Sequence, residues 1–155
     1  MVPQISQPFR EFLVEAKKKT YASESPEAVP EPFLESSRQL QYSNGRYLYR
    51  DIYFGSEQFS GIEVVYEGQT PIWTMVYSGG TNSPLDSREI YAFLKRALRS
   101  LSTDFPARGP RIFREGEFTY ENNYEGSLER FSGEELILLN ESEVYRLNYY
   151  GGMIR

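Results

Sequence analysis

The alternation of hydrophobic and polar residues along the chain predicts two helices and six strands. Phe9, Phe12, Leu13 and Ala16 recur at helical spacing and predict a helix over 9–20. A similar hydrophobic stripe predicts a second helix over 88–101. Short runs with strand-like alternation, bounded by turn residues, predict strands over 46–54, 59–66, 71–77, 117–124, 134–139 and 143–149. Because the connections between these strands are short, we expect neighbouring strands to follow one another as antiparallel meanders.

One stretch of the sequence occurs twice. FSGIEVVYEGQTPIWTMVYSGG (59–80) recurs in outline as FSGEELILLNESEVYRLNYYGG (131–152), and the preceding strands and helices also resemble each other. We therefore expect one α+β domain, 1–155, built from two helix-plus-three-strand units over about 9–80 and 88–152. The two units are expected to form a curved antiparallel sheet of about six strands, with both helices packed on one side.

Charge and residue usage narrow the functional classes. The net charge of −5 disfavours binding to nucleic acid phosphates. The basic clusters Lys17–Lys19 and Lys95, Arg96 and Arg99 are expected to be solvated sides of helices. With neither cysteine nor histidine present, thiolate nucleophiles, Ser-His-Asp catalysis and His-ligated metals are excluded, and we expect no cofactor. No signal-peptide-like or membrane-spanning apolar run occurs, so we expect a cytoplasmic protein without a membrane partner.

Four blocks of the chain carry a resemblance to a known family. They are FLVEAKKKTYA, SSRQLQYSNGRYLYRDIYFGSEQFSGIEVVY, RGPRIFREGEFTYENNYEG, and FSGEE with the terminal YYGGMIR. The chain resembles an uncharacterised bacterial domain of unknown function, found alone or fused to Xre-type helix-turn-helix regulators. The resemblance implies no catalytic residue, and it makes effector sensing an expectation by analogy. The predicted elements leave no segment for a helix-turn-helix unit, so direct binding of nucleic acid is not expected.

The candidate site is a face of tyrosines and carboxylates. Alternation places tyrosines and Asp51 on one side of their strand, Glu63 on one side of the next, and Trp73 and Tyr77 on one side of the third. If these sides coincide, the two carboxylates lie within an aromatic surface. Carboxylates among aromatics can bind a cation or an amine, or act as general acid or base when their pKa is raised. In the alternative interpretation, Glu63 and Glu135 are structural and accept bonds from tyrosine hydroxyls or pair with arginine, and their recurrence in both units favours this role. The candidate ligand-binding residues are Tyr49, Asp51, Tyr53, Glu63, Trp73, Tyr77 and Glu135.

The two units differ at three places, and specialised function is expected there. Asp51 corresponds to Asn122, Trp73 corresponds to Tyr145, and a long loop rich in proline and glutamate (22–35) has no counterpart in the second unit. Phe33 and Leu34 are expected to pin that loop to the body of the domain.

Three functional classes remain open. The leading interpretation is a non-enzymatic small-molecule-binding or sensing domain with a cavity lined by tyrosine, tryptophan and carboxylate. The first alternative is a homodimeric interaction module with exposed aromatics or a sheet edge. The second is a lyase- or isomerase-type enzyme that uses Asp, Glu and Tyr for acid–base chemistry. A cavity at these residues would favour ligand binding, whereas Asp51 and Glu63 on opposite faces of the sheet would exclude catalysis.

Overall fold

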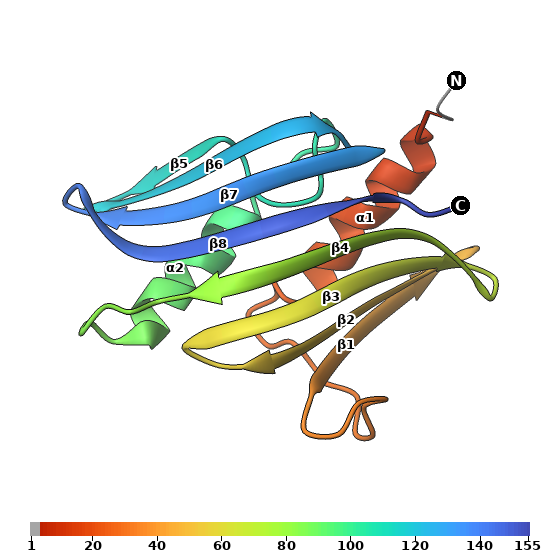
Figure 1. The fold of residues 1–155 in the computed structure, drawn as a ribbon, viewed down its shortest axis with the longest axis horizontal. Coiled ribbons are helices and arrows are strands. Elements are labelled where there is room, and N and C mark those ends of the chain that lie inside the picture. The colour runs from red at the N-terminus through yellow and green to blue at the C-terminus, as the bar shows by residue number, and fades with distance from the viewer. Residues whose placement is uncertain (1–3) are drawn as a thin grey trace.

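The computed structural model describes residues 4–155 as two helices and one large sheet (Figure 1). Helix α1 (Gln7–Lys19) precedes four strands, and helix α2 (Ser87–Leu98) precedes four more. The first four strands are β1 (Arg38–Asn44), β2 (Tyr47–Gly55), β3 (Gln58–Glu67) and β4 (Thr70–Gly80). The second four are β5 (Ile112–Glu115), β6 (Phe118–Ser127), β7 (Arg130–Leu139) and β8 (Ser142–Met153).

All neighbouring strands in the sheet are antiparallel, in the order β1-β2-β3-β4-β8-β7-β6-β5. Each group of four is a meander, as the short connections predict. The two meanders meet where β4 pairs with β8, with Tyr77 opposite Tyr149. The strand order is therefore symmetrical about this central pair, and both helices lie behind the sheet in Figure 1.

The prediction of an α+β fold with an antiparallel sheet is confirmed, but the expected number of about six strands is wrong. The two missed strands, β1 and β5, form the two edges of an eight-stranded sheet. β1 is rich in polar residues, with exposed Arg38 and Gln41 beside buried Gln39 and Leu40, so its sequence lacks a clean apolar alternation. β5 has only four residues and no fully buried side chain, which leaves little pattern to recognise.

Both helices begin at side-chain caps. Ser6 accepts a hydrogen bond from the backbone N–H of Phe9, and Asp86 accepts one from the N–H of Arg88. α2 ends at Leu98, three residues before the predicted end, and Leu101 packs in the following segment instead.

The loop after α1 is less firmly anchored than predicted. Phe33 and Leu34 are 66% and 49% exposed, so the expectation that these side chains pin the loop to the body of the domain by burial is wrong. Phe33 instead lies against the guanidinium of Arg50 at 4.7 Å, on the surface. The loop is held at other points, such as the backbone bond from Val29 to Gln39.

The core lies between the sheet and the two helices. Fully buried side chains such as Leu13 of α1, Phe93 of α2 and Trp73 of β4 fill this layer. The opposite face of the sheet has no helix over it in Figure 1, and there Val76 and Tyr150 form an exposed cross-strand pair on β4 and β8. Over residues 4–155, neither helix is long and apolar enough to span a membrane.

Candidate functional site

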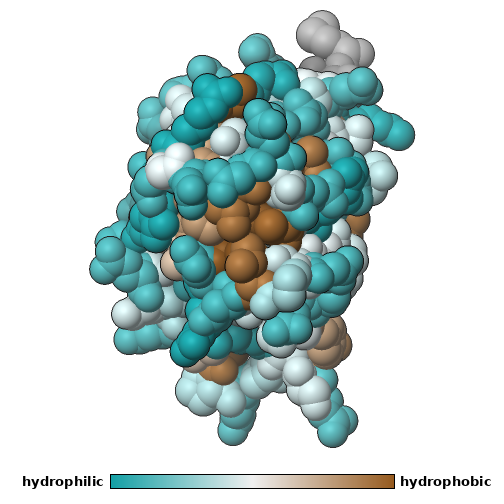
Figure 2. Space-filling view, turned by 90° about the vertical axis from the view of Figure 1, so that its left-hand side faces the viewer, coloured by the Kyte–Doolittle hydropathy of each residue, from teal (hydrophilic) through white to brown (hydrophobic). Residues whose placement is uncertain are grey.

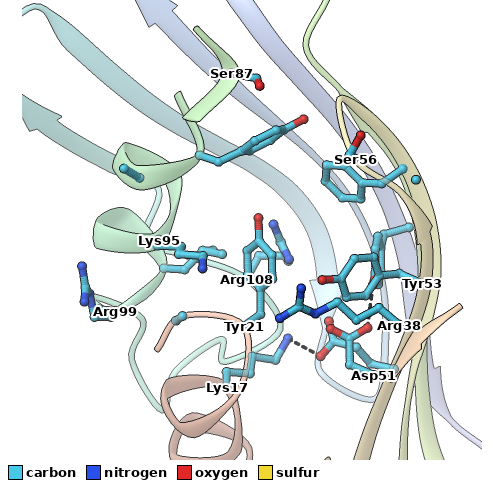
Figure 3. A pocket seen from close by; sticks show the side chains of 18 of the residues that line it. Lys17, Tyr21, Arg38, Asp51, Tyr53, Ser56, Ser87, Lys95, Arg99 and Arg108 are labelled. Carbon is cyan, nitrogen blue, oxygen red and sulfur yellow. Dashed lines mark hydrogen bonds and ion pairs between the residues drawn. The ribbon is translucent and has the colours of Figure 1, made fainter. Parts of the chain in front are cut away.

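A cavity of about 1270 Å³ lies between the first half of the sheet and the segments that cover it (Figure 3). Its walls come from the end of α1, the following loop, strands β1 to β4, α2, and the segment after α2. The structure brings five of the seven predicted ligand-binding residues to this cavity. They are Tyr49, Asp51, Tyr53, Glu63 and Tyr77.

The cavity lies toward one end of the molecule. Ser56, in the β2–β3 turn, and Ser87, at the start of α2, both line it. Figure 2 views the molecule from the side where this turn and this helix start lie in Figure 1. Hydrophobic atoms gather near the middle of that view, within a largely hydrophilic surface. The residues that line the cavity include apolar side chains such as Phe59 and Leu98 beside charged ones such as Lys95.

Asp51 and Glu63 are adjacent on the floor of the cavity. They are directly opposed residues of β2 and β3, so their side chains project from the same face of the sheet. Both are almost completely buried, at 3% and 2% exposure. Tyr77 donates a hydrogen bond to Asp51 at 2.5 Å, and Tyr49 donates one to Glu63 at 2.6 Å. The two carboxylates therefore converge on one place, with a tyrosine hydroxyl on each.

Lys17, from α1, adds a cation to this group of carboxylates and tyrosines. Its ammonium lies 2.9 Å from Glu63 and also donates a hydrogen bond to the backbone carbonyl of Ala107. The prediction that Lys17 belongs to a solvated basic helix end is wrong, because its side chain is only 10% exposed. Lys17 follows Leu13 by four residues and therefore lies on the buried face of α1.

The environment changes the protonation of Asp51. Burial raises its pKa, and the adjacent Glu63 carboxylate raises it further, to about 7. The Tyr77 hydroxyl and the Lys17 ammonium oppose this shift, because they stabilise the charged form. Burial likewise lowers the pKa of Lys17, against the effect of Glu63. Asp51 is thus a carboxyl group that exchanges a proton near neutral pH.

The second half of the sheet carries the corresponding residues in a closed arrangement. Glu135 is directly opposite Asn122, as Glu63 is opposite Asp51. Arg108 binds both oxygens of Glu135, with N–O distances of 2.6 and 2.7 Å. The hydroxyls of Tyr120 and Tyr145 also donate to Glu135, at 2.5 and 2.9 Å. Glu135 is fully buried, and four hydrogen bonds saturate its carboxylate.

Asn122 is equally enclosed. Its side-chain oxygen accepts a hydrogen bond from Tyr149, and its side-chain nitrogen donates to the backbone carbonyl of Gly109 at 2.9 Å. Tyr120 in turn accepts a bond from the backbone N–H of Gly109. In the second half, the segment that carries Arg108 and Gly109 therefore covers Asn122 and Glu135, the counterparts of the residues that form the cavity floor in the first half.

Two predicted site residues lie outside the cavity. Trp73 is fully buried, donates its indole N–H to the carbonyl of Leu128 at 3.0 Å, and stacks on Phe131. Glu135 is sealed in the cluster described above. These positions suit structural roles, and the structural alternative therefore fits Glu135 better than a ligand contact. Among the described residues, no group of three or more Asp or Glu side chains is arranged to hold a metal ion.

Several cavity residues were not recognised from the sequence. Lys95 was assigned to a solvated helix side, but it lines the cavity and is partly buried. Arg38, Tyr21 and Tyr91 also line it. Lys95 and Tyr91 are four residues apart on α2 beside its apolar stripe, a spacing that could have indicated a shared inner face. For Arg38, at the start of an edge strand, the sequence offers no comparable signal.

The comparisons with known proteins define the class of the chain. A family model described as "Domain of unknown function (DUF5680)" matches residues 51–154. The chain therefore belongs to this family. Comparison with curated proteins and with solved structures gives no match. The match begins at Asp51 and includes Glu63, Tyr77 and Arg108, whereas Lys17 and Arg38 precede it.

Proposed function

We propose that this protein is a small-molecule-binding or sensing domain whose ligand occupies the cavity above Asp51 and Glu63. The observation that carries the proposal is the difference between the two halves. In the second half, Arg108 binds the Glu135 carboxylate and Gly109 binds Asn122, whereas the same face of the first half borders a cavity of about 1270 Å³. A cavity of this size can enclose a drug-sized molecule, and aromatic walls with a few converging polar groups are typical of ligand sites.

We also infer that the two halves arose as copies of one unit and that only the first retained an open site. Three observations support this inference. These are the repeated FSG and Tyr-x-Gly-Gly patterns, the symmetrical strand order and the matching pairs Asp51–Glu63 and Asn122–Glu135. In this interpretation, Asp51 marks the half that binds ligand and Asn122 marks the half that is structural. Effector sensing for a bacterial transcriptional regulator, in the cytoplasm, is the biological setting that we propose.

Thermal-shift screening against a library of metabolites tests the proposal. We expect some compounds to raise the melting temperature of the wild-type protein, and Asp51→Asn to reduce that shift. Asp104→Asn is the matched control, because Asp104 is exposed and lies outside the cavity. A library that leaves the wild type unchanged, or equal shifts for all three proteins, would contradict the proposal.

Acid–base catalysis is a second candidate function, favoured by one observation. Asp51 has a pKa of about 7 and faces Glu63 across neighbouring strands within the cavity. A group that titrates near neutral pH is suited to transfer protons as a general acid or base. Compounds found by thermal shift are incubated with the protein and followed by NMR. Chemical conversion by the wild type but not by Asp51→Asn would favour an enzyme, and unchanged spectra would favour binding alone.

The homodimer stays a prediction. Its support is the exposed pair Val76 and Tyr150 on the face of the sheet that neither helix covers. Sedimentation equilibrium across a range of concentrations tests it, and a monomer at the highest concentration would remove it.

A further inference from the structure

The charge of the cavity wall is opposite to that of the whole chain. The protein has a net charge of −5, yet seven cationic side chains and four carboxylates line the cavity. Two of the cations, Lys17 and Arg108, are bound to the buried carboxylates of Glu63 and Glu135, respectively. The other five are distributed over the walls. They are Arg38, Arg88, Lys95, Arg96 and Arg99.

Three of these five wall cations have carboxylate partners. Arg88 pairs with Asp86 at 2.8 Å, Arg96 with Glu115 at 2.7 Å, and Arg99 with Glu24 at 3.4 Å. The two remaining cations are different. Within residues 4–155, no carboxylate oxygen lies within 4.0 Å of a side-chain nitrogen of Arg38 or Lys95.

Arg38 and Lys95 point into the same space from opposite walls. Arg38 begins β1 and is directly opposite Tyr53 of β2, on the face of the sheet that also carries Asp51. Lys95 comes from α2, with its ammonium 5.5 Å from the centre of the Tyr21 ring. Figure 3 shows Lys95 on the helix side of the cavity and Arg38 on the sheet side, and Arg38 also donates a hydrogen bond to the backbone carbonyl of Pro26 at 3.3 Å. Burial lowers the pKa of Lys95, and the charges of Arg38 and Arg99 lower it further, so these cations repel one another. An anion between them would relieve that repulsion.

The wall between these cations and the floor offers further polar contacts. Tyr21 and Tyr53 line the cavity, and neither hydroxyl bonds to another described residue. In contrast, the hydroxyls of Tyr49 and Tyr77 are already bound to the floor carboxylates. The free hydroxyls are therefore available to a ligand, and the bound ones hold the floor in place.

Comparison with the second half of the sheet indicates which hydrogen-bonding groups of a ligand Asp51 can bind. There, Asn122 donates its side-chain N–H to the carbonyl of Gly109. A carboxylate at the corresponding position, Asp51, reverses that requirement, because an ionised carboxylate only accepts hydrogen bonds. In its ionised form, which predominates above a pKa of about 7, Asp51 therefore requires a ligand group that donates an N–H or O–H.

We propose that the cavity binds small aromatic anions, with the carboxylate or phosphate group between Arg38 and Lys95 and an amino or hydroxyl group directed at Asp51. This inference rests on the proposed function and specifies its ligand class. Arg38 and Asp51 are diagonal neighbours on adjacent strands, a separation of about 7–8 Å between their backbones. A single aromatic ring with polar groups at both ends matches that scale.

Two fluorescent probes with one skeleton provide the test. 8-Anilinonaphthalene-1-sulfonate is an aromatic anion, and N-phenyl-1-naphthylamine is the same molecule without the sulfonate. We expect the anion to bind the wild type more tightly than the neutral probe. Arg38→Gln and Lys95→Gln should each weaken binding of the anion by about tenfold, because each removes a charge-assisted contact, and leave the neutral probe unchanged. Arg46→Gln is the matched control, since Arg46 is exposed, pairs with Glu67 and lies outside the cavity.

Displacement of the anionic probe then distinguishes the chemical groups. Phenyl phosphate and benzoate compare phosphate with carboxylate, and whichever displaces the probe at lower concentration identifies the preferred anion. 4-Aminobenzoate should compete better than benzoate with the wild type, and this advantage should disappear in Asp51→Asn. Equal displacement by both benzoates in the wild type would overturn the role of Asp51.

The outcomes separate this inference from the proposed function. If both probes bind equally and neither wall variant affects them, the cavity binds small molecules but the anion preference is wrong. If neither probe binds and the metabolite library also leaves the melting temperature unchanged, the ligand-binding function itself is contradicted. If Arg46→Gln weakens the anionic probe as much as Arg38→Gln does, the effect is one of overall charge, and the site between Arg38 and Lys95 is refuted.

Discussion

Asp51 lies directly opposite Glu63 on neighbouring strands, and both carboxyl groups are buried on the same face of the sheet. Two negative charges at this separation in a low-dielectric site repel, so one of the two groups retains its proton to higher pH than usual. Asp51 is that group, with a pKa raised from 3.8 to about 7 by burial and by Glu63. The corresponding residue of the second half, Asn122, has no charge to bury.

Asp51→Asn should therefore change how stability depends on pH. Because folding raises the pKa of Asp51, the folded wild type binds this proton more tightly, and its free energy of unfolding should decrease as pH rises from about 4 to about 7. Asparagine lacks this titration. We expect the variant to match the wild type near pH 4 and to exceed it by about 4 kcal/mol at pH 8, since one pKa unit corresponds to about 1.4 kcal/mol and the pKa of Asp51 rises from 3.8 to about 7.

Urea unfolding of both proteins from pH 4 to pH 9 measures this difference. Asp104→Asn, the same change at an exposed position, should show none of it. A difference between Asp51→Asn and wild type that stays constant over the whole range would contradict the raised pKa.

A glycine in β7 makes room for a buried tyrosine. A methyl group at Gly133 would lie 2.2 Å from Cζ of Tyr149, whose ring is fully buried. We therefore expect Gly133→Ala to lower the free energy of unfolding by about 2–3 kcal/mol, because neither the ring nor the backbone can move freely. Gly68→Ala is the comparison, since Gly68 has a φ of +62° but no atom within 4 Å of an added methyl group. Its cost should be only the backbone strain, about 1 kcal/mol. Chemical denaturation compares the two, and equal losses would argue against the steric explanation.

Trp73 should report on the core and not on the ligand. It is the single tryptophan of the chain, is fully buried, and does not line the cavity. We expect its fluorescence to be blue-shifted and resistant to quenching by iodide in the folded protein, with quenching restored in urea. Ligands that raise the melting temperature should leave the emission maximum in place. Strong iodide quenching of the native protein would show that Trp73 is accessible and would return it to the candidate site.

The sequence predicted the inner face of the sheet better than its edges or its covering segments. Strict alternation identified Tyr49 and Asp51 as one side of a strand and Trp73 and Tyr77 as one side of another, since side chains on a strand project with a period of two. The edge strand β1 was not predicted, because residues such as Arg38 face solvent or a cavity and the strand therefore lacks an apolar alternation. Arg108 could not be predicted, because its role depends on how an irregular segment folds back over Glu135.

Trp73 and Glu135 were predicted to lie in the site but do not line the cavity, and the reason is again that contacts between distant segments decide burial. Strand alternation gives the face on which a side chain lies, but it does not reveal whether that face is covered. Trp73 is covered by Phe131 and Glu135 by Arg108, both far away in the sequence. Comparison of the repeated stretches was more informative, because it singled out Asp51, whose counterpart is an amide.

Lys17 and its neighbour Lys18 form a matched pair for substitution, because they differ in burial. Lys17 is buried against Glu63, whereas Lys18 on the same helix is exposed. Replacing Lys17 by methionine removes the cation and leaves Glu63 buried without its ion pair, which typically costs about 3–5 kcal/mol. Lys18→Met should change the free energy of unfolding by less than about 0.5 kcal/mol.

A second substitution distinguishes the lost ion pair from lost packing. Glu63→Gln in the Lys17→Met background removes the unpaired charge, so the double variant should recover much of the stability lost by the single variant. The Glu63→Gln substitution should also lower the pKa of Asp51, because Glu63 is the neighbouring charge that raises this pKa. Urea unfolding of the four proteins in this cycle provides the measurement. If the two single substitutions at 17 and 63 are simply additive, Lys17 and Glu63 do not interact, and the floor of the cavity is not held by this ion pair.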